Sequence, residues 1–130
     1  MRSIIHQTVL LPAQAENLFN MYLNPSIHEA ITGAKVTISG QPGSEFNAFN
    51  GMLTGTMLTV IEPKLIIQSW RSGHFKDSDP DSTLILSFSP ESNNGRIDLI
   101  HLDVPEHDYQ QVVEGWKKFY WETWRKYLES

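Results

Sequence analysis

The chain ends in the segment EGWKKFYWETWRKYLES, which holds three of the four tryptophans in the sequence. On a helical wheel of about 100° per residue, a broad and mostly apolar stripe lies within about 80° of Trp116. The stripe consists of Tyr109, Val112, Val113, Phe119, Tyr120, Thr123, Trp124 and Tyr127. Lys118 and Glu122 lie on the opposite side, and Trp121 and Leu128 lie at the edge of the stripe, where we expect partial exposure. The segment predicts an amphipathic helix whose wide face must be covered by another element.

The central part of the chain alternates apolar and polar residues with period two, which indicates β-strands. The predicted strands are 34–39, 45–49, 53–61, 64–71, 82–89 and 95–103, and residues 3–10 predict one more at the N-terminus. Short connections rich in turn residues separate the later strands, so we expect an antiparallel meander. Asn50-Gly51 and Asn94-Gly95 are typical hairpin turns, and the second pair forms the strongest hairpin pattern in the sequence.

Two short helices are predicted between the first strand and the meander. Pro12 suits the first position of a helix. Asn24 is suited to cap a second helix, Pro25 to occupy its first turn, and Gly33 to end it. The predicted fold class is α+β: a curved antiparallel sheet of about seven strands around a long C-terminal helix, with residues 1–130 forming a single domain.

Composition excludes several classes of protein. The 130 residues include no cysteine, so disulfides, thiolate catalysis and Cys-zinc sites are excluded. The net charge of −5 comes without a basic stripe, which argues against nucleic-acid binding. No apolar run approaches the roughly 20 residues of a membrane span, and the N-terminal segment lacks the features of a secretory signal. We therefore expect a cytoplasmic protein without a membrane span.

Patterns of catalytic residues are missing from the sequence. The five histidines include no His-x-x-x-His pair, no serine lies in a Gly-x-Ser-x-Gly elbow, and the carboxylates show no pairing. His101 and Asp103 are predicted to share a strand face, which would begin a metal site, but a third ligand is not identifiable. We predict that the protein is not an enzyme and uses no cofactor and no metal.

A set of loosely defined motifs runs in order along the chain. They are the strand start at Gly43 and Phe46, the Asn50-Gly51 turn, Gly55, the Glu62-Pro63-Lys64 turn, Trp70-Arg71, the Val104-Pro105 helix entry and the Gly115-Trp116 pair. Together they resemble the activator of heat-shock protein 90 ATPase homologue-1-like domain, a member of the SRPBCC superfamily, which is also called START-like or birch-pollen-allergen-like. The resemblance implies a helix-grip fold, in which the sheet wraps the C-terminal helix and encloses a hydrophobic cavity.

The expected ligand-binding residues combine inward-facing sheet positions with the ring-rich face of the helix. They are Phe46, Met57, Trp70, Leu86, Phe88, Leu99, His101, Val112, Trp116, Tyr120 and Trp124. The same side chains would also serve to fill a closed core. His101 is expected either as a half-buried strand histidine or as a polar group in the cavity. Gly115 is expected to allow close packing or, alternatively, to leave room at the cavity mouth.

Three classes of function remain open. The preferred one is a non-enzymatic protein that holds a hydrophobic small molecule or lipid in the cavity. The second, implied by the resemblance, is a co-chaperone-type domain that binds a chaperone or another protein. In two-domain eukaryotic co-chaperones of this family a separate N-terminal domain makes the main chaperone contact, and no residues here correspond to it. The third is an enzyme of the cyclase or hydrolase kind, which requires an acid–base pair that the sequence does not display.

Overall fold

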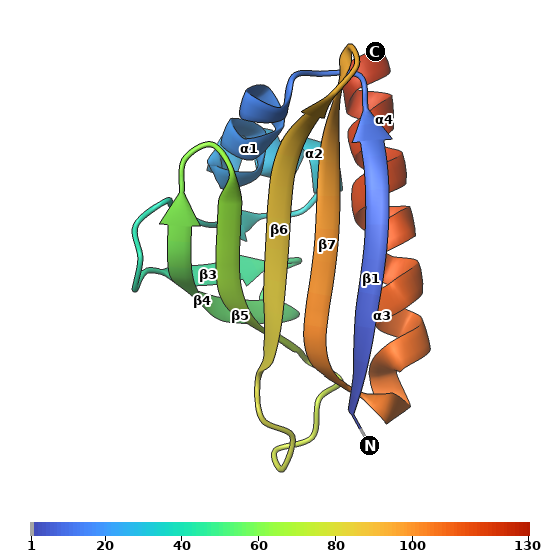
Figure 1. Ribbon diagram of the computed structural model, residues 1–130. Coiled ribbons are helices and arrows are strands. Elements are labelled where there is room, and N and C mark those ends of the chain that lie inside the picture. The colour runs from blue at the N-terminus through green and yellow to red at the C-terminus, as the bar shows by residue number, and fades with distance from the viewer. Residues whose placement is uncertain (1) are drawn as a thin grey trace.

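Seven antiparallel strands form one strongly curved sheet in the computed structural model, which describes residues 2–130 (Figure 1). The strands are β1 (Arg2–Leu11), β2 (Val36–Thr37), β3 (Glu45–Ala48), β4 (Leu53–Ile61), β5 (Leu65–Ser72), β6 (Ser82–Glu91) and β7 (Asn94–Pro105). Their order across the sheet is β1-β7-β6-β5-β4-β3-β2, so the N-terminal strand pairs with the last one. Of the predicted strands, 53–61 has the observed bounds, whereas 34–39 shrinks to two residues.

Helices cover the inner face of this sheet (Figure 1). The two short helices α1 (Ala15–Leu23) and α2 (Pro25–Thr32) follow β1 as predicted. The C-terminal helix consists of a 3₁₀ turn (Glu106–Asp108), α3 (Tyr109–Trp116), a π-helical turn (Lys117–Trp121) and α4 (Glu122–Glu129). It runs along β1 and β7, and this arrangement confirms the predicted helix-grip fold.

The inward positions of the strands were predicted with the correct parity. Along β5, β6 and β7, buried and partly exposed residues alternate strictly through most of each strand. All six predicted inward residues of the sheet are buried: Phe46, Met57, Trp70, Leu86, Phe88 and Leu99. The wide face of the terminal helix packs against these residues, so the core lies between the helix and the sheet.

The predicted stripe of the terminal helix is wrong in its second half. Phe119 and Tyr127 were expected on the buried face but are 53% and 39% exposed, whereas Trp121, expected at the edge, is only 8% exposed. The cause is the π-helical turn, in which the N–H of Glu122 bonds to the carbonyl of Lys117, five residues earlier. This extra residue rotates the following part of the helix away from the regular wheel.

The predicted hairpin at Asn94-Gly95 is displaced by two residues. The turn is made by Ser92 and Asn93, and Gly95 lies inside β7, paired with both Pro90 and Leu11. A Cβ atom on Gly95 would lie 2.6 Å from the carbonyl oxygen of Ala13, because the chain passes directly over this glycine as it leaves β1. Gly95 therefore permits a close backbone approach and does not form the turn.

The start of the first helix also differs from the prediction. Leu11 is still paired with β7, and a tight turn follows in which the Ala13 N–H bonds to the Leu11 carbonyl at 2.8 Å. The helix consequently begins at Ala15 and not at Pro12. The prediction for the second helix is confirmed, because the Asn24 side chain accepts a hydrogen bond from the Ile27 N–H at 3.1 Å and Gly33 ends the helix with a φ of 80°.

Candidate functional site

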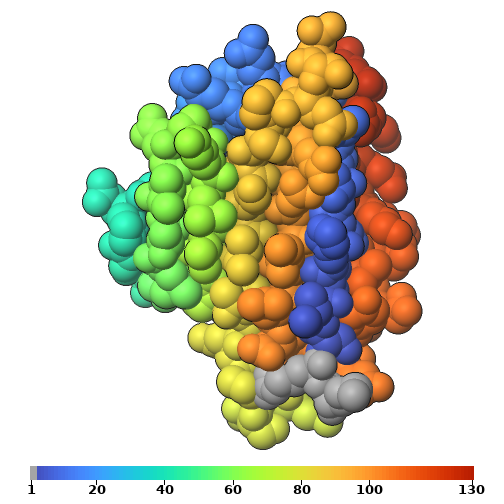
Figure 2. Space-filling model, viewed as in Figure 1, coloured from blue at the N-terminus to red at the C-terminus, as the bar shows by residue number. Residues whose placement is uncertain are grey.

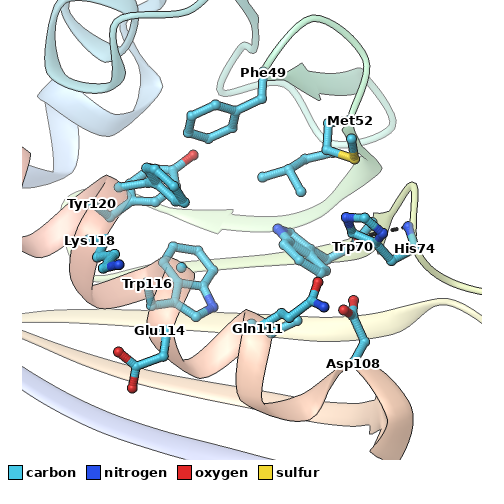
Figure 3. Close-up of a pocket in the computed structure, with 15 residues that line it drawn as sticks. Phe49, Met52, Trp70, His74, Asp108, Gln111, Glu114, Trp116, Lys118 and Tyr120 are labelled. Atoms are coloured by element: carbon cyan, nitrogen blue, oxygen red, sulfur yellow. Dashed lines mark hydrogen bonds between the residues drawn. The ribbon is translucent and has the colours of Figure 1, made fainter.

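A cavity of about 520 Å³ lies between the outer part of the terminal helix and the strands and turns of β3, β4 and β5 (Figure 3). Its walls are mainly apolar and aromatic. The lining residues are Phe49, Met52, Leu53, Trp70, Ser72, His74, Asp108, Gln111, Val112, Glu114, Gly115, Trp116, Lys118, Phe119 and Tyr120. Pockets for small molecules typically have volumes of about 300–1,000 Å³, so the cavity is large enough for such a ligand.

Four of the eleven predicted ligand-binding residues line this cavity: Trp70, Val112, Trp116 and Tyr120. The other seven do not line it and are buried in the core: Phe46, Met57, Leu86, Phe88, Leu99, His101 and Trp124. The inner part of the space between sheet and helix is therefore filled by side chains, and the open part lies toward the strands at the far side of the sheet. A ligand role stays a prediction for all eleven residues.

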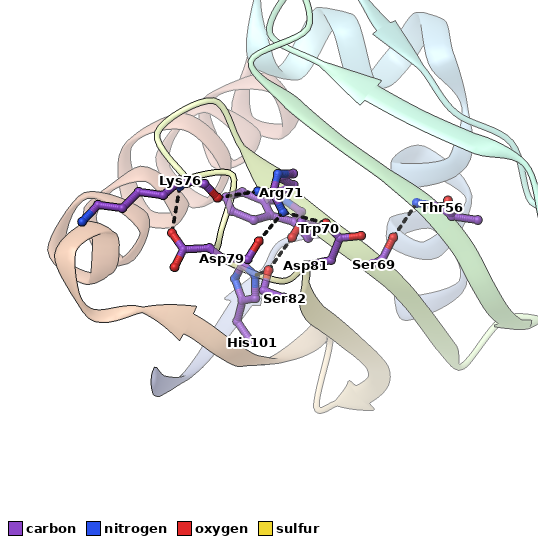
Figure 4. A network of polar contacts seen from close by, with 9 residues as sticks. All are labelled: Thr56, Ser69, Trp70, Arg71, Lys76, Asp79, Asp81, Ser82 and His101. Carbon is purple, nitrogen blue, oxygen red and sulfur yellow. Dashed lines mark hydrogen bonds and ion pairs between the residues drawn. The ribbon is translucent and has the colours of Figure 1, made fainter. Parts of the chain in front are cut away.

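His101 holds Trp116 in place at the cavity wall. The side chain of His101 is fully buried on β7, and the Trp116 indole Nε1–H donates to its Nδ1 at 3.2 Å. The His101 Nε2 lies 2.8 Å from Oγ of Ser82, and this hydroxyl donates to the backbone carbonyl of Trp70 at 2.6 Å (Figure 4). Because Nδ1 accepts, the proton of the neutral ring is on Nε2. Burial lowers the pKa of His101 to about 3, so the ring stays neutral.

Neither expectation for His101 and its neighbour Asp103 is met. His101 is neither half-buried nor exposed to the cavity; it supports a cavity residue from behind. Asp103 was expected on the same strand face, but its φ of 61° turns it outward, and it is exposed. The pair therefore does not form the beginning of a metal site. Within residues 2–130, no group of three or more potential metal ligands is found.

Tyr120 is fixed by a second buried network. Its hydroxyl lies 2.9 Å from Nε2 of His28, and Nδ1 of the same histidine lies 2.8 Å from the Tyr22 carbonyl oxygen. Since a carbonyl only accepts, His28 donates from Nδ1 and Tyr120 donates to Nε2. The Tyr22 hydroxyl in turn donates to Gln68 Oε1 at 2.7 Å. Burial lowers the pKa of His28 to about 4 and raises the pKa of Tyr120, so this network is uncharged near neutral pH.

An apolar rim surrounds the mouth of the cavity. Phe119, which the π-helical turn leaves exposed, meets Phe49 edge-on with a distance of 5.8 Å between the ring centroids. Met52, on the same turn as Phe49, is 44% exposed. The nearest heavy atom to a Cβ on Gly115 would be Phe119 Cδ2 at 3.8 Å, so close packing is not the reason for this glycine. Gly115 leaves space at the cavity, which was the alternative expectation.

The opposite end of the cavity is polar. Ser72, His74, Asp108 and Gln111 gather there beside the indole of Trp70 (Figure 3). Asp108 is only 2% exposed, and burial raises the pKa of its carboxyl group, although the hydrogen bond from Ser72 acts against this. The cavity thus joins an apolar mouth to a buried polar end.

A loop between β5 and β6 closes this polar end. Arg71 holds the loop by donating to the carbonyl oxygens of Asp79 and Lys76 at 2.8 and 2.7 Å, and to the Asp81 carboxylate at 3.0 Å (Figure 4). His107, at the start of the terminal helix, lies 2.9 Å from Asp79 and connects the loop to that helix. These contacts fix the position of the segment that contains His74.

Eleven lining residues were not predicted, and some of them share a pattern that was visible in the sequence. Asp108, Val112, Gly115 and Phe119 follow each other at spacings of four, three and four residues, which places them on one face of a helix. That face borders the core stripe but carries both a carboxylate and a glycine, features typical of a helix face that lines a space. The residues from the β3–β4 turn, Phe49 and Met52, have no comparable sequence pattern.

The fold and cavity define a helix-grip domain with a partly open apolar interior. The chain belongs to the family described as activator of Hsp90 ATPase homolog 1-like protein, which it matches over residues 12–129, so the resemblance inferred from the motifs is confirmed. No helix within residues 2–130 is long and apolar enough to cross a membrane.

Known relatives agree with this assignment. The chain is 22% identical over 112 residues to the human activator of 90 kDa heat shock protein ATPase homolog 1, a match that covers 82% of the chain and 31% of the human protein. It spans about a third of the length of the curated relatives it matches. The crystal structure of an HSP90 activator from Plasmodium falciparum superposes with a TM-score of 0.87 at 19% identity, covering 97% of this chain and 96% of that one. A protein of Mesorhizobium loti superposes with a TM-score of 0.84 at 18% identity, over 98% and 97% of the two chains. At these identities the structural matches show the fold alone.

Proposed function

We propose that the protein binds an apolar small molecule or lipid in the cavity between the sheet and the terminal helix. The observation that carries this proposal is the cavity of about 520 Å³, whose walls are formed by Trp70, Trp116 and Tyr120 and by the rim residues around Phe119. Apolar walls with a few polar groups at one end are typical of small-molecule sites.

The rigidity of the walls supports the same function. Trp116 and Tyr120 are each held by a hydrogen bond from behind, to His101 and His28, and their own rings lie 4.7 Å apart. A side chain that is already fixed loses little conformational entropy when a ligand binds, which favours affinity. Gly115 keeps the space open at a helix position where alanine would give greater helix stability.

A cavity-blocking variant tests the proposal. Native mass spectrometry of the protein purified from its own cell extract should reveal a bound small molecule, and 1-anilinonaphthalene-8-sulfonate should bind with increased fluorescence. Gly115→Leu, which places a side chain in the cavity, should abolish both results, whereas the control Glu122→Leu, on the exposed side of the same helix, should retain them. Equal dye binding by the two variants, or none by the unaltered protein, would contradict the proposal.

A second candidate function is the binding of a chaperone, as the names of the relatives suggest. The supporting observation is an apolar row across the outer face of the sheet, where Ile67 pairs with Ile85 and Ile85 with Ile100. All three side chains are partly exposed. Figure 2 shows this outer face, on which the side chains of β5, β6 and β7 form one continuous surface beside β1. Exposed apolar surface of this kind often marks a protein interface.

The two candidates respond oppositely to two substitutions. In a pulldown against the heat-shock protein 90 of the host, Ile85→Lys should abolish capture if the outer face binds the chaperone, while Gly115→Leu should leave it unchanged. The reverse result would place the chaperone contact at the cavity mouth. A non-enzymatic role and a cytoplasmic location belong to both proposals.

A further inference from the structure

The polar end of the cavity contains two buried atoms whose hydrogen-bonding capacity is unused. Within residues 2–130, neither Oδ2 of Asp108 nor Nε1 of Trp70 has a hydrogen-bond partner. Both residues line the cavity, and their side chains are almost completely buried, since Asp108 is 2% and Trp70 is 4% exposed. Buried polar groups in proteins are nearly always paired, so two unpaired atoms at one cavity end indicate a missing partner.

Asp108 is not used by the helix that it precedes. It occupies the N-cap position of α3, where an aspartate side chain commonly accepts a hydrogen bond from the first turn, yet it makes no such bond. Its carboxyl group is directed instead to the end of the cavity near Trp70 and His74 (Figure 3). Ser72 hydrogen-bonds the carboxyl group, which leaves Oδ2 open toward the cavity.

The two atoms differ in what they require. The indole N–H of Trp70 only donates, so its partner must accept, and an ionised Asp108 carboxylate only accepts, so its partner must donate. One hydroxyl group satisfies both conditions, because its oxygen accepts while its O–H donates. An ether or ketone can serve only Trp70, and a hydrocarbon serves neither.

We infer that the cavity selects aromatic or similarly flat apolar molecules that carry one hydroxyl group, whose oxygen accepts from Trp70 and whose proton is donated to Asp108. The apolar body of such a ligand packs against Trp116, Tyr120 and the rim at Phe49. This inference rests on the proposed small-molecule function and adds the chemical class of the ligand.

Three probes with the same bicyclic body test the inference. Naphthalene lacks oxygen, 2-methoxynaphthalene accepts only, and 2-naphthol both accepts and donates. Titration of the ¹⁵N-labelled full chain by NMR measures each affinity and follows the indole N–H resonance of Trp70, assigned with Trp70→Phe. We expect 2-naphthol to bind about ten-fold more tightly than naphthalene, with 2-methoxynaphthalene between them. Only the two oxygen-containing probes should shift the Trp70 resonance strongly downfield.

Asp108→Leu separates the two hydrogen bonds. In this variant the preference for 2-naphthol over 2-methoxynaphthalene should disappear, while naphthalene binds at least as well as before. The matched control is Glu122→Leu, which removes an exposed carboxylate outside the cavity and should keep the preference for 2-naphthol.

The possible failures are distinct. Equal affinities for the three probes, with an unmoved Trp70 resonance, would overturn the inference and leave the proposed function standing. Failure of all three to bind the unaltered protein would overturn both. The comparison of probes needs only the unaltered protein, so it decides the question even if Asp108→Leu does not fold.

Discussion

Trp116 donates its indole N–H to Nδ1 of His101 at 3.2 Å, and this bond connects the cavity wall to a histidine that solvent cannot reach. The bond requires a neutral ring, because a protonated imidazole has no acceptor nitrogen. The same is true of His28, whose Nε2 accepts from Tyr120. Two aromatic side chains of the cavity are therefore positioned by two neutral histidines.

Stability should consequently fall as the pH decreases below about 6.5, the pKa of histidine in an unfolded chain. In the folded protein burial lowers the pKa of His28 to about 4 and of His101 to about 3. Between these values the unfolded state binds protons that the folded state does not. Each histidine therefore reduces the free energy of unfolding by about 1.4 kcal/mol per pH unit between about pH 6 and pH 4.

Urea unfolding at several pH values measures this slope. His101→Gln and His28→Asn remove one titrating group each while keeping a hydrogen-bonding side chain, so each should reduce the slope by about one proton. Carboxylates such as Asp98 and Asp108 titrate in all these proteins and cancel in the comparison with the unaltered chain. Identical slopes in all three proteins would show that the histidines are not held neutral by the fold.

The π-helical turn predicts which rings of the terminal helix contribute to stability. Phe119→Ala should lower the free energy of unfolding by no more than about 1 kcal/mol, because Phe119 is 53% exposed. Trp121→Ala should lower it by about 3–5 kcal/mol, because Trp121 is buried and stacks on Trp116 with ring centroids 5.7 Å apart. Chemical denaturation compares the two, and a larger loss for Phe119→Ala would show that the helix has a regular register.

The contact between the first strand and the terminal helix gives another test. The Trp121 indole donates to Gln7 Oε1 at 2.7 Å, and Gln7 Nε2 donates to the Val113 carbonyl at 3.3 Å. Gln7→Leu leaves the indole without an acceptor and should cost about 1–3 kcal/mol. Gln7→Glu keeps an acceptor for Trp121 and should cost less in the same urea measurement. Equal losses would mean that the indole bond contributes nothing measurable.

Two glycine-to-alanine substitutions should have opposite effects. Gly115→Ala meets only Phe119 at 3.8 Å and should raise the free energy of unfolding by up to about 1 kcal/mol, through better helix propensity. Gly55→Ala should lower it by about 1–3 kcal/mol or more, because the new Cβ would overlap the backbone carbonyl of Ser69 on the adjacent strand. Thermal unfolding measures both, and destabilisation by Gly115→Ala would contradict the open space at this position.

Much of the fold follows from local patterns. Strand positions such as Leu86 and Leu99 were predicted to face inward from the alternation alone, because the side-chain period of a strand is two and one face must be buried. The bounds of β4 and the Asn24 cap of α2 likewise depend only on residues close in sequence. The ring-rich terminal segment identified the helix that the sheet encloses.

The cavity could not be predicted in the same way. It is the volume that remains where the curvature of the sheet and the rotation of the helix leave surfaces apart. Of the predicted residues, Trp116 lies at that volume and Trp124 does not, although both belong to the same apolar stripe. Residues from the β3–β4 turn, such as Phe49, reach the cavity only because the sheet bends over the helix.

The sequence by itself determined the order of the elements, the inward face of most strands and the amphipathic character of the terminal helix, since each depends on the spacing of neighbouring residues. Only the tertiary structure decided the π-helical turn that buries Trp121 and exposes Phe119, the role of Gly95 beneath the first helix, and the pairing of Trp116 with His101. These features depend on how surfaces distant in sequence fit together, and a local period carries no information about that fit.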